Sequence, residues 1–304
     1  MSVLAQTSGT HEAQVLRWRG LGLVALAAVI WSTGGLIVRS LEVADVWTTV
    51  LWRSLFATLF LLLFIAVREG RHTPAVFLGM GRAGLLIALC FAVASTSLVV
   101  SLNLTTVANT LIIFSTSPFF AAVFGWLLLR ERVRPATWLA MAGASLGVAI
   151  MVSESLGRGS IVGDLLAAVT AIGLALATVT IRANPGVRMT PATCLGALLA
   201  GLAALPLATP LAVTASDFGL LFAFGALQLG LGLALFTGGA RLAPAADVAL
   251  VCLLEPILGP FWVWGLLGEH PGKAGLLGGG LVLAALLGHS ARELCRRRSL
   301  PPAV

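Results

Sequence analysis

One carboxylate stands inside a long apolar run in the last fifth of the chain. The stretch VCLLEPILGPFWVWGLLGEH, residues 251–270, carries Glu255 and no other charged residue before Glu269. In a wet, low-dielectric cavity, desolvation would favour the neutral form of this side chain, so it could exchange a proton or hold an ammonium group. The stretch therefore points to proton or ammonium binding.

Two prolines follow the carboxylate. Pro256 and Pro260 each lack an N–H and push against the carbonyl four residues earlier, so the carbonyls of Cys252 and Pro256 lose their helical partners. In hydrocarbon such groups need another partner, and a doubly broken helix is tolerated only beside protein or water. We expect the helix that carries Glu255 to line a cavity, and a simple packing kink is the alternative.

The composition shows what surrounds these residues. Of 304 residues, 59% are hydrophobic and 10% are charged, whereas a soluble globular chain carries roughly 25% charged residues. The formal net charge of +7 does not indicate a nucleic-acid partner, because the basic residues lie in short clusters between apolar runs. Each run has about 20 residues, enough to cross ~30 Å of hydrocarbon. The chain is therefore expected to be an integral membrane protein.

The hydropathy pattern predicts an all-α membrane protein with ten transmembrane helices. Arg17 and Arg19 precede the first apolar run without a cleavage pattern, so the first span should remain in the mature chain. Short linkers make sequence neighbours antiparallel, and the longest linker, 68–82, is basic. The expected spans are residues 20–38, 47–67, 83–102, 107–129, 135–152, 161–181, 190–208, 217–237, 246–267 and 275–290.

The basic residues predict the orientation of these spans. Only Arg39, Arg158 and Lys273 lie in the odd-numbered loops. By the positive-inside rule, the other side is cytoplasmic, and both termini lie there. The basic residues on that side are Arg17, Arg19, Arg68, Arg71, Arg82, Arg130, Arg132, Arg134, Arg182, Arg188, Arg241, Arg292, Arg296, Arg297 and Arg298.

A motif occurs once in each half of the chain. SPFFAAVFGWLLLRE, residues 117–131, aligns without gaps on EPILGPFWVWGLLGE, residues 255–269, and both contain the pattern P-x7-W-x4-E. The pattern closes the fourth span of each five-span half. Because a half with an odd number of spans must place its copy upside down, the chain is expected to form two inverted five-helix repeats, with a substrate site near the midplane. The matched pairs are Pro118 with Pro256, Trp126 with Trp264 and Glu131 with Glu269.

This organisation resembles the EamA-type members of the drug/metabolite transporter superfamily. The resemblance runs from about residue 20 to residue 290 and includes WSTGG at residues 31–35 and Arg53 in the second span. It implies two EamA-like repeats, at 20–152 and 161–290, joined by a periplasmic linker at 153–160. The flanking segments are a cytoplasmic N-tail, 1–19, and a basic C-tail, 291–304. Amino-acid exporters of the YddG type are among the relatives that it suggests.

Arg53 leaves two readings of Glu255 open. Arg53 is the only basic residue well inside a span, so the two side chains could form a buried ion pair. Alternatively, Glu255 faces a wet cavity and Arg53 extends outward toward the interface. The expected depths of the two Cα atoms differ by ~9 Å at ~1.5 Å per residue. That difference favours the cavity reading.

Two tryptophans are candidates for the wall of the cavity. Trp31 lies in the first span, and Trp262 lies two turns beyond Glu255. Large aromatic side chains at such depths commonly shape an apolar pocket that has a few polar contacts. A lipid-facing or core position is the alternative for both, and it is favoured slightly for Trp262.

Other polar residues inside the spans are candidate substrate contacts. Gln228 and Asn109 rank first, because an amide is hard to satisfy within its own helix, and Ser97 is included although serine usually bonds its own helix or a neighbour. Pro118 is a second expected helix break without a carboxylate, since Ser117 takes the place of Glu255. Any charge-based function is therefore expected in the second half alone.

Glycine pairs are expected to pack the last span of each half closely. Gly143-x3-Gly147 lies in the fifth span and Gly275-x3-Gly279 in the tenth. Small residues at this spacing allow helix backbones to approach each other in membranes. We interpret both pairs as scaffold.

The sequence contains no enzyme signature. It has no nucleotide-binding loop, no metal-ligand spacing and no catalytic triad with a loop to carry it, and its four cysteines suggest neither disulfides nor a cofactor. Together with the resemblance, this predicts an inner-membrane secondary transporter that exports small amphipathic metabolites, with amino acids the leading substrate and protons a candidate coupling ion. The alternatives are an exporter of cationic toxic compounds, a channel or a scaffold protein.

Overall fold

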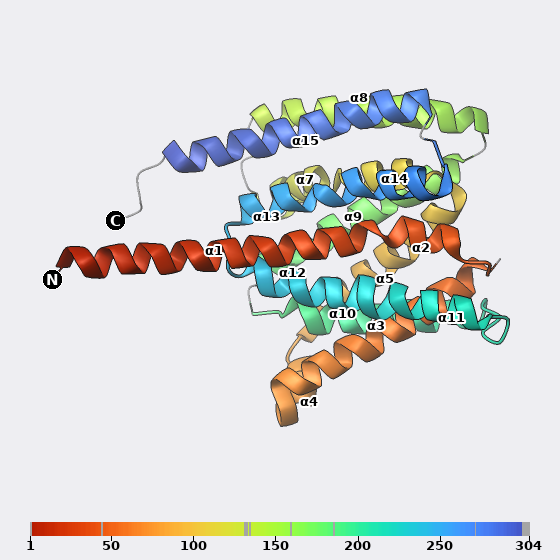
Figure 1. The fold of residues 1–304 in the computed structure, drawn as a ribbon, viewed down its shortest axis with the longest axis horizontal. Coiled ribbons are helices and arrows are strands. Elements are labelled where there is room, and N and C mark those ends of the chain that lie inside the picture. The colour runs from red at the N-terminus through yellow and green to blue at the C-terminus, as the bar shows by residue number, and fades with distance from the viewer. Residues whose placement is uncertain are drawn as a thin grey trace.

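The structure is a computed structural model that describes residues 2–43, 45–130, 133, 135–158, 160–184, 186–270 and 272–299. Every regular element in these ranges is helical (Figure 1). The helices are α1 (Ser2–Ser32), α2 (Gly34–Ser40), α3 (Val46–Glu69), η1 (Gly70–His72), α4 (Thr73–Leu78), α5 (Gly81–Leu104), α6 (Val107–Phe114), α7 (Ser117–Leu129), α8 (Pro135–Arg158), α9 (Ile161–Ala183), α10 (Met189–Ala204), α11 (Ala215–Phe222), η2 (Ala223–Leu231), α12 (Gly232–Ala240), α13 (Ala245–Cys252), α14 (Leu254–Leu267) and α15 (Lys273–Ser299).

These helices form the ten predicted spans. Six spans are single helices, whereas the first, fourth, eighth and ninth are divided into α1 and α2, α6 and α7, α11 with η2 and α12, and α13 and α14. Among the described residues, nine spans are long and apolar enough to cross a membrane, and α10 is an apolar helix of 16 residues. The predicted all-α fold with ten spans is confirmed.

Several helices extend beyond the predicted spans. α1 begins at Ser2 inside the expected N-tail, α8 continues to Arg158 through most of the expected linker, and α15 continues to Ser299. The longest predicted linker contains η1 and α4. Hydropathy marks the apolar part of a helix, whereas backbone hydrogen bonding continues into polar sequence, so the apolar run underestimates helix length.

The main helix pairs join the two halves. α5 packs on α9, α1 on α12, α3 on α10 and α8 on α15. Exchanging each span with its counterpart in the other half turns the α5–α9 pair into the α1–α12 pair and leaves the other two unchanged. This is the pairing expected of two repeats that are related by a twofold axis. Figure 1 shows α8 beside α15, with the start of α1 and the end of α15 at the same end of the bundle.

The fifth and tenth spans pack closely at one glycine of each, Gly147 of α8 and Gly278 of α15. A Cβ on Gly147 would lie 2.5 Å from the carbonyl oxygen of Gly278, and a Cβ on Gly278 would overlap the Gly147 carbonyl. Gly279, which the motif assigned to this contact, instead meets Ile112 of α6. The contact is therefore shifted by one residue on α15, because the rotation of a helix about its axis is not set by the spacing of its glycines.

A buried core occupies the region where the divided spans meet. It includes Val99 of α5, Leu111 of α6, Phe224 of η2 and Val263 of α14, which are each at most 3% exposed. These helices therefore hold the interruptions of the first, eighth and ninth spans close to one another.

Candidate functional site

The first span is interrupted by a polar turn between α1 and α2. The hydroxyls of Ser32 and Thr33 donate to the carbonyls of Val29 and Ile30, at 2.6 Å and 2.7 Å. These bonds replace part of the backbone pairing that an apolar environment requires. The carbonyl of Trp31 accepts a hydrogen bond from another span.

That other span contributes η2, a π-helical segment. Its Gln228 is 6% exposed, and the side-chain Nε2 donates to the Trp31 carbonyl at 2.9 Å. The Gln228 Oε1 and the Trp31 indole Nε1 are both buried without a hydrogen-bond partner. π-Helical segments are rare and often mark functional sites. One buried acceptor and one buried donor therefore have no partner in this structure, and the indole itself lies against Gly232 of α12.

The ninth span completes this group of residues. The Trp262 indole Nε1 donates to the Ser32 hydroxyl at 2.9 Å. Nearby on α14, a Cβ at Gly259 would lie 3.5 Å from the Ser32 carbonyl oxygen. We call Trp31, Ser32, Gln228 and Trp262 the midspan cluster. It joins one span of the first half to two spans of the second.

Glu255 lies on the helix face that points toward this cluster. It is in the first turn of α14, directly after the interruption at Leu253. Residues 255, 259 and 262 are spaced by four and three, so they share one side of the helix. Within the described part of the chain, no residue donates a hydrogen bond to the Glu255 carboxylate or forms an ion pair with it.

The prolines of α14 face a different direction. Pro256 and Pro260 line an apolar groove of about 280 Å³ together with Trp264, on the side of α6 and α15. α14 is continuous through Pro260, so the expected second break is absent and that prediction is wrong. The one interruption precedes Pro256, and a proline in the first helical turn is tolerated because the N–H groups there have no helical partner. Pro118 has the corresponding place in the first turn of α7.

Arg53 is buried and does not pair with Glu255. The residue is 3% exposed, its Nη1 donates to Ser95 Oγ at 2.6 Å, and its guanidinium carbon lies 4.5 Å from the centre of the Phe224 ring. The proposed ion pair is not formed, and the expected outward direction of Arg53 is wrong. α3 turns this side chain toward α5 and η2, whereas Glu255 stands on α14.

Asn109 and Ser97 lie on α6 and α5, which carry no residue of the midspan cluster. Asn109 lies in the first turn of α6, and its Nδ2 donates to Asp164 Oδ1 at 3.3 Å. Asp164, in the first turn of α9, also accepts from Thr105 Oγ1 at 2.8 Å. Ser97 is buried within α5. In this structure Asn109 therefore connects α6 to α9.

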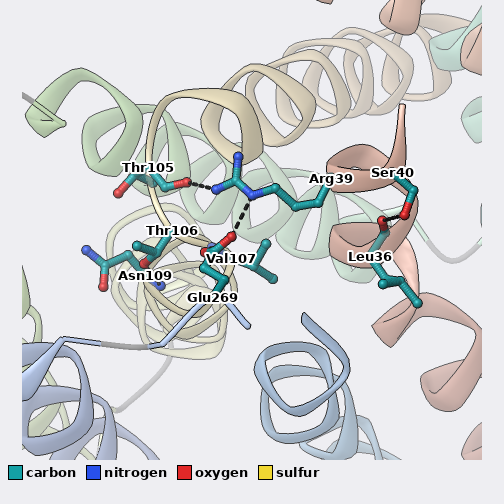
Figure 2. Close-up of polar contacts among 8 residues, drawn as sticks. All are labelled: Leu36, Arg39, Ser40, Thr105, Thr106, Val107, Asn109 and Glu269. Atoms are coloured by element: carbon teal, nitrogen blue, oxygen red, sulfur yellow. Dashed lines mark hydrogen bonds and ion pairs between the residues drawn. The ribbon is translucent and has the colours of Figure 1, made fainter. Parts of the chain in front are cut away.

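Glu269 bridges three segments at the end of the bundle opposite the chain termini (Figure 2). Arg39 Nε donates to Glu269 Oε2 at 2.7 Å, and Arg39 Nη2 donates to the Thr105 carbonyl at 2.7 Å. The Val107 N–H at the start of α6 donates to Glu269 Oε1 at 3.1 Å. We call Arg39, Thr105, Val107 and Glu269 the Glu269 bridge. Glu131, the matching residue of the first repeat, lies outside the described residues.

The end of the bundle that holds the termini has its own ion pairs. Arg17 Nη2 lies 2.6 Å from Asp247 Oδ2 and joins α1 to α13. Arg188 Nη1 lies 2.6 Å from Glu69 Oε1, at a polar pocket of about 120 Å³. In both pairs the arginine is about half exposed, at 42% and 52%. Polar contacts between different spans therefore occur at both ends.

Metal and disulfide chemistry have no basis in the described ranges. Within them no three His, Cys, Asp or Glu side chains are grouped in a way that could hold a metal ion. Cys90, Cys194, Cys252 and Cys295 are free. The titratable groups that remain available are therefore single side chains such as Glu255.

Comparison with known proteins places this architecture in a family. The model of the EamA-like transporter family matches residues 18–153 and again residues 161–290. The chain belongs to this family of membrane transporters. An uncharacterized transporter of Pseudomonas aeruginosa, PA0485, is 34% identical over 138 residues, which cover 43% of this chain and 45% of that relative. A solved structure described only as "Crystal structure of protein" matches 93% of this chain, and the match includes 100% of that structure's chain. The TM-score is 0.63 and the sequence identity is 19%, so this similarity supports the fold alone.

Sequence reasoning missed three buried acids of this EamA-like transporter. Asp164, Asp217 and Asp247 each lie in the first turn of a helix and are at most 8% exposed. Asp217 accepts a hydrogen bond from the backbone N–H of Glu42 at 3.0 Å. A single acid near the start of an apolar run was the available signal, because a helix N-terminus stabilises a negative charge.

Proposed function

We propose that this EamA-like transporter is a secondary carrier of the inner membrane that exports small amphipathic metabolites, amino acids above all, by alternating access. The observation that carries the proposal is the midspan cluster. There, interrupted helices of both halves leave Gln228 Oε1 and Trp31 Nε1 buried without partners. Secondary transporters bind substrates where such interrupted helices meet near the membrane midplane.

An α-amino acid suits the groups around this cluster. Its ammonium could bind Glu255, which shares a helix face with Trp262 and has no partner among the described residues. Trp31 and Trp262 would supply apolar surface for a side chain, and the free donor and acceptor would bind its polar atoms. Glu255 could also exchange protons with the membrane surfaces, which would couple export to a proton gradient.

The Glu269 bridge supplies a means of closing one end of the path. It ties α2, the turn before α6 and the segment after α14 to one another. Its charged side chains are 27% and 25% exposed, so separation would return both to water and would not strand a buried charge. The positive-inside rule assigns this end to the periplasm and both termini to the cytoplasm. We propose that the bridge opens when substrate is released.

An exporter of cationic toxic compounds is the second candidate, because a lone acid also suits a purely positive substrate. Counterflow measurements in liposomes that contain the purified protein would separate the candidates. We expect saturable counterflow of amino acids. Saturable counterflow of organic cations alone would favour the second candidate, flux without saturation or counterflow would indicate a channel, and no flux would leave a scaffold.

A further inference from the structure

Arg53 is a buried cation whose counter-charge is missing from the described residues. It is 3% exposed, and the three ion pairs found among the described residues do not include it. A charged side chain inside a membrane span is energetically costly unless it is compensated. Buried charges in proteins are normally paired and fully hydrogen-bonded.

The contacts of Arg53 leave part of its bonding capacity unused. Ser95 Oγ accepts one N–H at 2.6 Å, the Phe224 ring lies 4.5 Å from the guanidinium carbon, and the buried Nε has no hydrogen-bond partner. A hydroxyl and an aromatic face orient a guanidinium, but neither carries negative charge. Guanidinium groups bind carboxylates through two parallel N–H donors. The missing partner therefore has the chemistry of a carboxylate.

Arg53 is connected to the midspan cluster through η2. Its backbone carbonyl lies so close to Gly225 that a Cβ there would overlap it. Phe224, which the guanidinium covers, also approaches Gly34: a Cβ at Gly34 would lie 3.5 Å from Phe224 Cε2 and 2.8 Å from Gln228 Nε2. The aromatic platform of Arg53 and the amide of the midspan cluster thus meet at one glycine, directly after the interruption of the first span.

We propose that Arg53 binds the carboxylate of the transported substrate. Glu255 then binds the ammonium. The substrate is therefore a zwitterion whose carboxylate binds a residue of α3 and whose ammonium binds a residue of α14. The inference rests on the proposed function and narrows it, because a purely cationic compound would leave Arg53 uncompensated. Phe224 and Ser95 act as positioning residues that hold the guanidinium.

The test compares amino acids with their amides. Leucine and phenylalanine carry a carboxylate, whereas leucinamide and phenylalaninamide carry the same ammonium and side chain without it. Counterflow of all four should be measured for the wild type, Arg53→Gln, Arg53→Lys and the control Arg68→Gln, which removes an exposed arginine from the last turn of the same helix. We expect the wild type to prefer the acids by at least ~tenfold, which corresponds to ~1.4 kcal/mol.

Arg53→Gln should abolish this preference, because it removes the charge that the carboxylate needs. Arg53→Lys should keep the preference with a higher KM, since lysine keeps the charge but lacks the two-donor fork. Arg68→Gln should keep the preference as well. An unchanged acid-to-amide ratio in Arg53→Gln, or a wild-type ratio near one, would overturn the inference.

Failure of the proposed function gives a different pattern. If the wild type shows no flux of any probe, the carrier proposal is wrong. Ligand binding to the purified protein then tests whether Arg53 binds a carboxylate. A rise in the Tm of the detergent-purified wild type with leucine but not leucinamide, absent in Arg53→Gln, would still support the carboxylate site, and no difference would overturn it. Aggregation of both Arg53 variants would assign the residue to the fold and also overturn its assignment to the substrate.

Discussion

The fourth and ninth spans carry the same interruption in opposite halves of the molecule. α6 and α13 begin at matched positions of the repeat, and each has eight residues. In both spans a proline lies in the first turn of the helix that follows, where its missing N–H removes no helical bond. The broken backbone is therefore a property of the repeat and not of one half.

The side chains at the two breaks differ. In the fourth span, the hydroxyls of Ser115 and Thr116 donate to the carbonyls of Ile112 and Ile113, each at 2.7 Å. In the ninth span, the matching residues are Leu253 and Leu254, which have no hydroxyl to donate. The first break is therefore stabilised by its own side chains, as a structural element should be.

The next position widens this difference. Ser117 follows the first break, whereas Glu255 follows the second. Both breaks occur in apolar spans, but only the second is followed by a carboxylate, which shares a helix face with Trp262. We propose that the two copies of this backbone have different roles, with the fourth span as scaffold and the ninth span as the one that binds charge.

The largest expected effect concerns the orientation of the spans in the membrane. If the two spans are inverted, reporter fusions in the 68–82 loop, in the 182–189 loop and after Pro302, which lies outside the described residues, should all report the cytoplasm. A fusion within 153–160 should report the periplasm, because odd-numbered loops carry few basic residues. A cytoplasmic signal from 153–160 would remove the inversion and with it the alternating-access proposal.

Substitution at the matched positions tests the division of roles. Glu255→Gln keeps the shape of the side chain but removes its charge, so the protein should remain stable. It should lose either the pH dependence of transport or at least ~tenfold of the rate for ammonium-bearing substrates. A tenfold loss of rate corresponds to ~1.4 kcal/mol of activation free energy. Ser117→Ala should stay within about twofold of the wild-type rate. Because Arg53 is not paired with Glu255, Arg53→Gln should not restore any lost thermal stability.

Counterflow rates across pH, with Tm measured in parallel, provide the check. Wild-type rates for Glu255→Gln at every pH and for every substrate would remove this residue from the mechanism. Equal losses in Ser117→Ala would show that both breaks serve transport.

The next largest expected effect is on substrate preference, and it compares two tryptophans. Trp31 belongs to the midspan cluster, whereas Trp126 of α7 is 48% exposed. Trp31→Ala should change the ratio of apparent affinities among substrates by several-fold, and Trp126→Ala should leave it unchanged. Expression and a monodisperse gel-filtration peak should persist in both. Identical apparent affinities in wild type and Trp31→Ala would place Trp31 in the scaffold.

A substitution of Glu269 tests whether the motif of the ninth span also stabilises the end of the bundle opposite the chain termini. Glu269→Ala removes an acceptor of two hydrogen bonds, one from a charged donor, so the free energy of unfolding should fall by about 1–3 kcal/mol. The pair of Arg188 and Glu69 is a control, and Arg188→Gln should have a smaller effect because water screens the arginine, which is 52% exposed. Thermal unfolding in detergent would measure both, and the opposite order would argue against a closing role for the bridge.

The smallest expected effect lies at the starts of the two spans. Thr106 Oγ1 accepts from the Asn109 N–H at 3.1 Å and caps α6, whereas Pro244 precedes α13 without a side-chain cap. Thr106→Ala should cost about 1 kcal/mol of stability, and Pro244→Ala should cost less. Chemical denaturation in detergent could resolve this difference. Equal losses would mean that the cap of α6 contributes nothing specific.

Much of this architecture could be predicted from local sequence. Apolar run length predicted ten spans because the membrane requires that length of helix. The repeated P-x7-W-x4-E pattern predicted matched fourth spans, because proline acts on its own helix through the carbonyl four residues earlier. Glu255 was found for the same reason: a single charge in an apolar run is visible without knowing its neighbours.

The partners of these residues were decided by tertiary structure. Arg39 and Glu269 are 230 residues apart, as are Ser32 and Trp262, and no local pattern joins them. Asn109 turned out to bond Asp164, and Arg53 turned out to be buried against Phe224. Which residues meet depends on the rotation of each helix about its axis and on its neighbours across the two halves. Hydropathy averages over a helix, so it determines where a span lies but not which way its side chains point.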